Sequence, residues 1–327
     1  MNRVSVVVPV YRCLPHVEGC LRSVLAQTRP AHEIVLVDDR GGDESMAVAQ
    51  RYLTARGANF RSVVHDENRG LGRARNSGLA ASTGDLVWFL DSDDEADPRF
   101  LELLTDALES GSADFACTRT RRVDEAGRVL QIDEPPFGAL VISGEDFARH
   151  LVLGSAKAYA CTKLFRRELL GERPWDEGQG YEDMAPALRM ALASERVALV
   201  DEPLYRYLYR EGSISTSLGP RTFDLFKVER DVRATVAGAG LADRWQRALL
   251  GFRYREIFRS VAHVAMRADH ASPSRPDLYD DAIRRVRAAV SVRDVTPLLR
   301  TGHLREAVFA VLLKFAPALY STILRYR

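Results

Sequence analysis

The stretch Val87-Trp88-Phe89-Leu90-Asp91-Ser92-Asp93 decides the fold, because an apolar run ends abruptly there in two carboxylates. Residues 85–90 predict a buried strand of an α/β sheet. Asp91 and Asp93 follow the carboxyl end of that strand, where open α/β sheets bind their ligands, and in an extended segment they point the same way. Such a pair suits a hard divalent cation, Mg or Mn, that accompanies a nucleotide diphosphate. The alternative is a solvated acidic turn before Pro98.

The sequence on either side of this stretch alternates predicted strands and helices. Apolar, β-branched runs predict further strands at 4–8, 33–37 and 60–64. One-sided apolar patterns predict helices at 17–27, 44–55 and 73–81, the last one after a Gly-rich turn. This order predicts an α/β fold with a mainly parallel, doubly wound sheet.

The chain changes character further on. Residues 99–218 mix strand and helix signals. Long amphipathic helices are predicted near 222–238, 243–268 and 277–290, with a Pro-containing break at 272–276. We therefore expect an α/β domain at 1–218, whose halves meet near residue 98, and a C-terminal helical region at 219–327.

The composition excludes several classes of protein. The chain has 327 residues, 46% of them hydrophobic and 28% charged, and its net charge of +1 gives no general attraction to nucleic acid. Four cysteines without a C-x-x-C pair argue against a disulfide framework and a zinc site, and they suit a reducing cytosol. The apolar start is too short, and ends too sharply at Pro9, for a signal peptide. No stretch supplies the ~20 apolar residues of a membrane span, so a cytoplasmic location is expected.

Polar side chains from four separate segments are expected at one edge of the sheet. Asp38-Asp39 ends the second strand, Arg75 lies in the helix after the Gly-rich turn, Asp91 and Asp93 end the fourth strand, and Glu182-Asp183 follows much later. A parallel sheet brings strand ends that are distant in sequence together. The sequence therefore predicts one composite site.

A series of ordered motifs together resembles the family-two glycosyltransferases of the GT-A fold. They extend over residues 3 to about 217, two thirds of the chain. The matching text is Val4-Ser5-Val6-Val7-Val8-Pro9-Val10-Tyr11, Val35-Leu36-Val37-Asp38-Asp39, Asn68-Arg69-Gly70 with Ala74-Arg75-Asn76-Ser77-Gly78, Thr83-Gly84-Asp85, Leu90-Asp91-Ser92-Asp93-Asp94, and later Lys163-Leu164-Phe165-Arg166, Tyr181-Glu182-Asp183-Met184 and Tyr205-Arg206-Tyr207 through Arg210 to Ser215.

The resemblance implies an inverting, metal-dependent hexosyl- or N-acetylhexosaminyltransferase that uses a nucleotide-sugar, favoured as a UDP-sugar. The acceptor would be a hydroxyl of a bacterial cell-surface glycan, a teichoic-acid-like polymer or a lipid-linked molecule. Residues 1–98 would be the nucleotide-binding half and residues 99–218 the acceptor half. Sugar-phosphate nucleotidyltransferases are the alternative enzyme class, but the expected G-x-G-x-R loop after the first strand is absent. A non-catalytic glycan-binding relative is the other alternative.

The resemblance also assigns roles to residues. Asp183 would be the general base that deprotonates the acceptor, with Glu182 orienting that acceptor. Asp39 would accept a hydrogen bond from a uracil N3–H. The metal ligands would be Asp93 and Asp91, with Mn or Mg as the ion. The remaining nucleotide-sugar contacts would come from Pro9, Val10, Tyr11, Asp38, Arg75, Asp91, Ser92 and Arg210.

The chain departs from the family pattern at two loops near the nucleotide. Arg12 stands where the family usually has Asn, and Arg40-Gly41-Gly42-Asp43 replaces the common Gly-Ser-Thr-Asp. These departures concern the choice of base and sugar more than the reaction.

Structural roles stay open as alternatives for several of these residues. Asp38 could cap the following helix, and Arg75 could pair with an acid on a solvated helix face. Glu182-Asp183 could begin a helix, where acids favour the dipole. Trp175 is expected in the core or a lid, and Lys163 is as easily a packing residue as a phosphate contact.

The C-terminal segment carries a separate pattern. Residues 280–327 hold nine Arg or Lys against four acids. A basic amphipathic helix of this kind can lie on an anionic membrane surface, or its apolar face can pack on the preceding helices or on a second subunit. The apolar residues at helical spacing are Leu304, Val308, Val311, Leu312, Phe315, Leu319 and Ile323.

Overall fold

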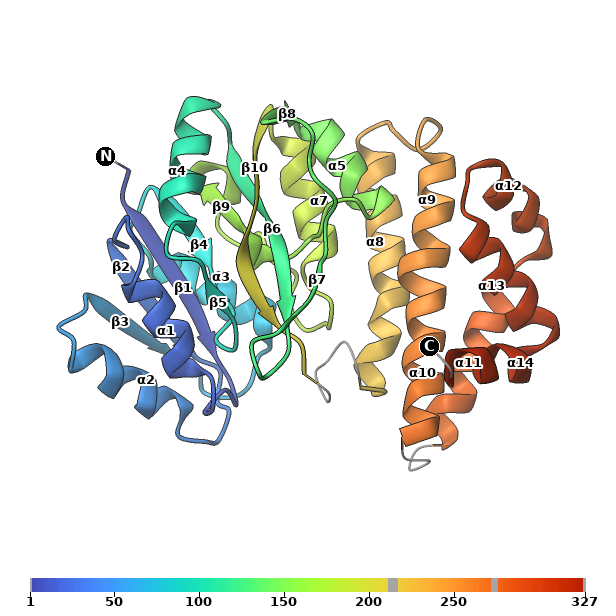
Figure 1. Ribbon diagram of the computed structural model, residues 1–327, viewed down its shortest axis with the longest axis horizontal. Coiled ribbons are helices and arrows are strands. Elements are labelled where there is room, and N and C mark those ends of the chain that lie inside the picture. The colour runs from blue at the N-terminus through green and yellow to red at the C-terminus, as the bar shows by residue number, and fades with distance from the viewer. Residues whose placement is uncertain (1, 211–216, 272–275, 326–327) are drawn as a thin grey trace. The chain divides into compact units, whose positions relative to one another are not determined.

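The computed structural model describes residues 2–210, 217–271 and 276–325 (Figure 1). The motif residues 211–216 and the predicted break at 272–275 lie outside the described residues. The described chain forms two compact units, one from residues 2–151 and 155–210 and the other from residues 152–154 and the described part of 211–327. Each unit has its own core of buried hydrophobic residues.

A single mixed sheet forms the centre of the first unit. Its strand order is β3-β2-β1-β4-β9-β6-β10-β5, with β7 beside β6 and β8 beside β10. Pairing is parallel across β3-β2-β1-β4 and between β6 and β10, and antiparallel elsewhere. The strands are β1 (Val4–Val10), β2 (Glu33–Asp38), β3 (Phe60–Val64), β4 (Leu86–Phe89), β5 (Glu95–Ala96), β6 (Phe115–Val123), β7 (Val129–Ile132), β8 (Val141–Ser143), β9 (Lys163–Arg166) and β10 (Arg196–Leu208).

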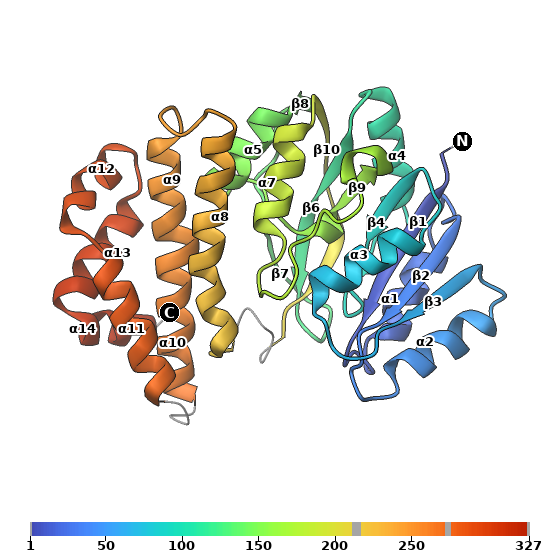
Figure 2. The same ribbon diagram turned by 180° about the vertical axis from the view of Figure 1, so that it is seen from behind.

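Helices cover both faces of this sheet, as the predicted doubly wound fold requires. Figures 1 and 2 show α1 and α2 on one face and α3 on the opposite face. Because both faces are covered, β1 is buried along its whole length and reads as a continuous apolar run. The helices are α1 (Val17–Leu25), α2 (Ser45–Thr54), α3 (Leu71–Ala81), α4 (Phe100–Ser110), α5 (Gly144–Leu153), the short η1 (Ala160–Thr162), α6 (Arg167–Leu170) and α7 (Met184–Ala193).

Helix α3 lies unusually close to the sheet at Gly78. A β-carbon built on Gly78 would lie 2.2 Å from Cγ1 of Val7 and 3.1 Å from Cγ2 of Val37. Only a residue without a side chain allows this approach. The close packing fixes the position of Arg75, one turn earlier on the same helix.

The second unit is entirely helical in its described residues. Its core contains Val228, Val232, Phe252, Phe258 and Val261, which are all buried. The elements are η2 (Pro220–Phe223), α8 (Asp224–Gly238), α9 (Gln246–Phe252), the π-helical η3 (Arg253–Phe258), α10 (Arg259–Ala271), α11 (Pro276–Ala289), η4 (Val292–Asp294), α12 (Val295–Arg300), α13 (Leu304–Phe315) and α14 (Pro317–Arg325).

Helices α13 and α14 present an apolar face to solvent. Phe315 is 71% exposed and Leu304 is 62% exposed. The opposite side of the same helices is tied to the unit: Phe309 and Leu313 are buried, and Tyr320 lies 2.7 Å from His263, measured from the hydroxyl to Nε2. The exposed apolar face, called the C-terminal face below, consists of Leu304, Val308, Val311, Phe315, Leu319 and Ile323. These six residues are 39–71% exposed, so packing on the preceding helices does not bury this face.

Among the described residues, none of the helices combines the length and the apolar content needed to cross a bilayer. All four cysteines, Cys13, Cys20, Cys117 and Cys161, are buried with free thiols.

Candidate active site

The ends of β1 and β2 lie side by side and bring the first predicted residues together. Val10 pairs in register with Asp38, and the Asp39 amide donates to the Val10 carbonyl at 3.1 Å. Pro9 and Val10 are buried in β1, whereas the Tyr11 ring is 42% exposed. Tyr11 is therefore available to a flat ligand at this edge of the sheet.

Asp39 is buried and accepts four hydrogen bonds within the protein. His65 Nδ1 lies 2.7 Å from Oδ1, and the Arg69 amide donates to the same oxygen at 2.9 Å. Asn68 Nδ2 donates to Oδ2 at 3.0 Å and the Gly70 amide at 2.9 Å. Asp39 thus holds the turn that leads into α3, and a nucleobase could bind this carboxylate only by replacing one of the four donors.

Asp38 ends β2, and the two unusual arginines lie in the loops that follow β1 and β2. Oδ1 of Asp38 accepts from the Arg40 amide at 2.9 Å, so Asp38 closes a tight turn and does not cap α2, which begins at Ser45. Arg12 and Arg40 both have positive φ, 48° and 56°. Asn and Gly tolerate this left-handed conformation best, so it accounts for the family pattern at both positions. Here, hydrogen bonds from Arg12 Nε to the Gly41 carbonyl and from Arg40 Nε to the His65 carbonyl hold the two arginines.

Arg75 joins the end of β4 to the segment before α7. It is only 2% exposed, its Nη2 donates to Asp91 Oδ1 at 2.8 Å, and its Nη1 pairs with Glu182. Burial opposes the charge of this guanidinium, but the carboxylates of Asp91 and Glu182 hold its pKa above the ordinary arginine value. A pairing of Arg75 on a solvated helix face is therefore wrong.

The acidic residues after β4 have different surroundings. Asp93 pairs with Arg210, whereas Asp94 is buried and accepts from the Tyr205 hydroxyl and the Leu208 amide, both at 2.7 Å. Burial, and then the neighbouring charge of Asp91, raises the pKa of Asp93. Ser92 is buried between them. Asp94 thus has a structural role, whereas the side chains of Asp91 and Asp93 are partly exposed.

Glu182 and Asp183 lie directly before α7. This position agrees with the alternative that the two acids mark the start of a helix. Asp183 occupies the N-cap position, but its side chain makes no capping hydrogen bond. Burial raises the pKa of both carboxyl groups, with the positive charge of Arg75 acting in the opposite direction. A carboxylate that is not used for capping and has a raised pKa is suited to accept a proton.

Two neighbouring residues have structural roles. Trp175 is buried, and its ring packs edge-to-face on Phe89 at 5.1 Å between centroids. Lys163 is also buried, and its Nζ donates to the carbonyls of Lys157 and Tyr159 at 2.7 and 2.8 Å. Neither side chain is therefore positioned to contact an acceptor or a phosphate.

Asp91, Asp94 and Cys161 offer ligand atoms within 4.8 Å of one another. This trio is a poor cation site, because Asp94 already accepts two hydrogen bonds and burial raises the thiol pKa of Cys161 well above its ordinary value. A protonated thiol is not a ligand for a hard ion. Asp91 and Asp93 are the better pair.

Comparisons with known proteins agree with this arrangement. The model of the Glycosyl transferase family 2 matches residues 5–173. The chain belongs to glycosyltransferase family 2. EpsH of Bacillus subtilis strain 168, which is named a glycosyltransferase, is 27% identical over 232 residues, and the match covers 68% of this chain and 65% of EpsH.

Two solved structures share the family-2 fold. S. aureus TarS 1–349 in complex with UDP-GlcNAc has a TM-score of 0.70 at 21% identity, covering 95% of this chain and 90% of that one. The Pyrobaculum calidifontis mannosyltransferase PcManGT, in complex with GDP-Man and Mn2+, has a TM-score of 0.53 at 19% identity, covering 99% and 84%. At these identities the likeness concerns the fold.

Sequence reasoning missed three residues that organise this family-2 site. His65 links Asp39 to the Ser77 hydroxyl, with 2.8 Å between Nε2 and Oγ. Tyr205 holds Asp94, and Glu177 accepts from Arg73 Nη1 at 3.1 Å. Tyr205 lay within a quoted motif, but nothing in the sequence indicated its partner, because the contacting residues are more than a hundred positions apart.

Proposed function

We propose that this protein is an inverting glycosyltransferase that moves a sugar from a nucleotide-diphosphate donor, favoured as a UDP-sugar, to an acceptor hydroxyl. The observation that carries the proposal is the buried Arg75, which joins Asp91 at the end of β4 to Glu182, next to Asp183. A permanent cation between a donor-side acid and an acceptor-side acid suits a reaction whose leaving group is a diphosphate.

The donor would bind along the ends of β1, β2 and β4. Tyr11 would offer its exposed ring to the base, next to Pro9, Val10 and Asp38, and Ser92 and Arg210 would contact the sugar and diphosphate. For Asp39 to accept from a uracil N3–H, we expect the base to replace the side-chain amide of Asn68. Asn68 is exposed, so its side chain can turn away from Asp39 more easily than the other donors can. UDP should then bind roughly ten- to a hundred-fold more tightly than CDP, which corresponds to about 1.5–3 kcal/mol for one charged hydrogen bond.

A divalent cation, Mn or Mg, fits the carboxylates of Asp91 and Asp93. Among the described residues, one oxygen of Asp91 accepts from Arg75 and one oxygen of Asp93 accepts from Arg210. The second oxygen of each carboxylate can then serve as a hard ligand. Burial and Asp91 raise the pKa of Asp93, and a nearby cation would oppose this crowding of like charges. When bound, the ion would neutralise negative charge on the leaving diphosphate.

Asp183 would act as the general base, with Glu182 orienting the acceptor through its fixed pairing to Arg75. Asp183 takes the proton of the acceptor hydroxyl while the hydroxyl oxygen bonds to the anomeric carbon. The bond from that carbon to the diphosphate oxygen breaks in the same displacement, so the configuration inverts.

Nucleotide binding tests the donor assignment directly. UDP, CDP and GDP, and the corresponding sugars, are compared by thermal shift with and without Mn2+, since a ligand stabilises the folded state by mass action. We expect the largest shift with a UDP-sugar and Mn2+. Asn68→Ala should keep the preference for UDP over CDP, and Asp39→Ala should remove it. Equal affinity for UDP and CDP would contradict the proposed base contact.

We also propose that the acceptor is a cell-surface glycan, a teichoic-acid-like polymer or a lipid-linked molecule, and that the protein works in the cytoplasm at the inner face of the membrane. The C-terminal face supports this, because six apolar side chains are exposed there. Arg305 and Lys314 lie on α13, where Arg305 is exposed and Lys314 is half-buried, and the acid of that helix, Glu306, is buried against Arg259. The exposed charge of α13 is thus positive, which favours an anionic bilayer over a second copy of the same face.

A further inference from the structure

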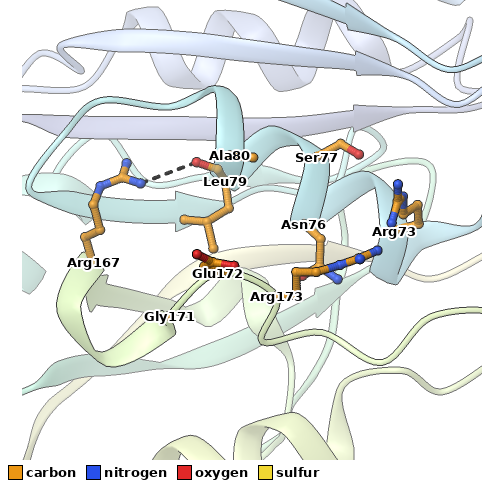
Figure 3. A pocket seen from close by; sticks show the side chains of 9 residues that line it. All are labelled: Arg73, Asn76, Ser77, Leu79, Ala80, Arg167, Gly171, Glu172 and Arg173. Carbon is orange, nitrogen blue, oxygen red and sulfur yellow. Dashed lines mark hydrogen bonds between the residues drawn. The ribbon is translucent and has the colours of Figure 1, made fainter.

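A cavity lies beside α3, formed by that helix and the segment after β9. Its volume is about 510 Å³, within the usual range for small-ligand sites. Figure 3 shows Arg167 at one end and Arg73 and Arg173 at the other, with Glu172 between them. Ser77 of α3 also lines the cavity, but its hydroxyl group lies 2.8 Å from Nε2 of His65. The lining therefore carries three guanidinium groups beside the apolar side chains of Leu79 and Ala80.

The positive charge of this cavity is only partly balanced. Arg73 and Arg173 share a single carboxylate, that of Glu177, at 3.1 and 2.8 Å. Arg167 donates to the Gly84 and Leu79 carbonyls and to Ser82 Oγ, which are neutral acceptors. Burial lowers the pKa of Arg167, with the charges of Glu33 and Asp85 acting in the opposite direction. Glu172 supplies the one acid of the lining, and it is exposed.

The carboxylate shared by the two arginines belongs to the loop that ends at the proposed general base. This loop, residues 173–183, is held to α3 by Glu177 and by Asn76, whose amide donates to the Trp175 carbonyl at 2.9 Å and to Glu177 at 2.8 Å. Tyr181, directly before Glu182-Asp183, has a φ of 56°, a strained value for a tyrosine. Contacts at Glu177 therefore restrain the path of the chain to Asp183.

We propose that this cavity binds a phosphate group, and that the bound anion competes with Glu177 for Arg73 and Arg173 and so loosens the 173–183 loop. Guanidinium groups bind phosphate oxygens with paired, charge-assisted hydrogen bonds. The ligand can be free phosphate or a phosphate within a larger molecule. The effect on the loop matters for turnover only if Asp183 is the base, and in that respect the inference rests on the proposed function.

Binding is tested with two variants that should act in opposite directions. Inorganic phosphate and a glycerol phosphodiester are titrated by calorimetry into the full-length protein, with the nucleotide site filled by UDP. Arg173→Gln should weaken binding at least ten-fold, and Glu172→Gln, which removes the opposing charge of an exposed side chain, should tighten it several-fold. Arg51→Gln is the matched control, because this exposed arginine on α2 pairs only with a surface glutamate, Glu44.

The relative affinities for the two probes identify the source of the phosphate. Tighter binding of inorganic phosphate indicates a free anion, and tighter binding of the diester indicates a phosphate within a larger molecule. If neither probe binds, or if Arg173→Gln and Glu172→Gln both leave the affinity unchanged, the proposed site is wrong.

Loop release is measured by amide hydrogen exchange in residues 173–183. Phosphate should speed exchange in this loop, and Glu177→Gln should do the same without phosphate, because the variant weakens the contact with both arginines. Exchange that phosphate does not alter would overturn the competition with Glu177. Neither measurement requires turnover, so a failure here is separate from a failure of the glycosyltransferase assignment.

Discussion

Asp183 combines a cost in stability with a proposed use in catalysis. Burial raises its pKa above the ordinary value of 3.8. A carboxyl group whose pKa is raised on folding favours the folded state less as pH rises through that pKa, since the charged form is disfavoured there. Folding therefore disfavours the charged form of Asp183, which is the form that a general base needs.

Replacing Asp183 with Asn should separate these two effects. Turnover should fall by ~10²–10⁴, the range for a lost general base, while donor affinity stays nearly constant. The melting temperature should rise at neutral pH, and this gain should vanish as pH falls below the carboxyl pKa, where native Asp183 is protonated. Thermal melting against pH and steady-state kinetics check both parts. Lost UDP affinity with preserved turnover would contradict the role as base.

Asp93→Asn tests the proposed metal site at the same scale. The substitution keeps the shape but removes one anionic ligand, so it should abolish Mn2+-dependent turnover and the Mn2+-dependent thermal shift, with the fold intact. Asp94→Asn serves as the structural comparison, because Asp94 is buried against Tyr205 and its loss should lower stability. Native-like activity in Asp93→Asn, or activity that survives a chelator, would rule out the metal assignment.

The individual site residues were predictable to different degrees. Asp91, Arg75 and Glu182 were expected at one sheet edge, and the structure brings them into direct contact. The sequence did not indicate that hydrogen bonds within the protein occupy both oxygens of Asp39. The partners His65, Asn68 and Gly70 belong to the loop after the exposed strand β3, and the sequence does not specify the path of that loop.

At the scale of elements, the contact of α3 with the sheet depends on Gly78. Gly78→Ala should destabilise the protein by about 1–3 kcal/mol, as overpacking does, because the new methyl group would overlap Val7. Chemical denaturation measures this change. Gly238→Ala, at the end of α8, is the matched control: nothing lies within 4 Å of the added carbon, so the substitution should be neutral or slightly stabilising. Equal effects of the two substitutions would contradict the close packing of α3.

The predictability of the elements follows the kind of contact that forms them. β1, β2 and β4 were predicted because strands buried on both faces read as apolar runs. The antiparallel strand β9 was not predicted, since Lys163–Arg166 is short and is a strand only through pairing with β4 and β6. The long helices of the second unit were predicted well from their apolar period, which is a local property.

At the scale of the whole molecule, the C-terminal face predicts attachment to anionic membranes. The double variant Leu304→Ser, Phe315→Ser should weaken binding to anionic vesicles on the order of 100-fold, if each side chain contributes at least about 1.5 kcal/mol on burial. Binding should also weaken with salt, because charges are screened over about 8 Å at physiological ionic strength. Vesicle co-sedimentation measures both effects.

Point substitutions are required here, since deleting α13 and α14 would also remove the buried Phe309 and Leu313. Leu140→Ser is the matched control, because Leu140 is 77% exposed but lies in the first unit. A native protein that ignores anionic vesicles at low salt would end the membrane proposal, and a concentration-dependent dimer that the double variant abolishes would assign the face to a second copy.

The four buried cysteines have a practical consequence for observing this protein at work. Burial raises the thiol pKa at each of them, to about 11 for Cys117. Alkylating reagents attack the thiolate and need access to it, so the native protein should react slowly with maleimides. A single cysteine introduced at exposed Gly178 would therefore accept a fluorophore selectively, without removal of the native thiols, although a side chain strains the backbone at its φ of 73°. Such a label would report the motion of the 173–183 loop in real time, in an otherwise unaltered chain.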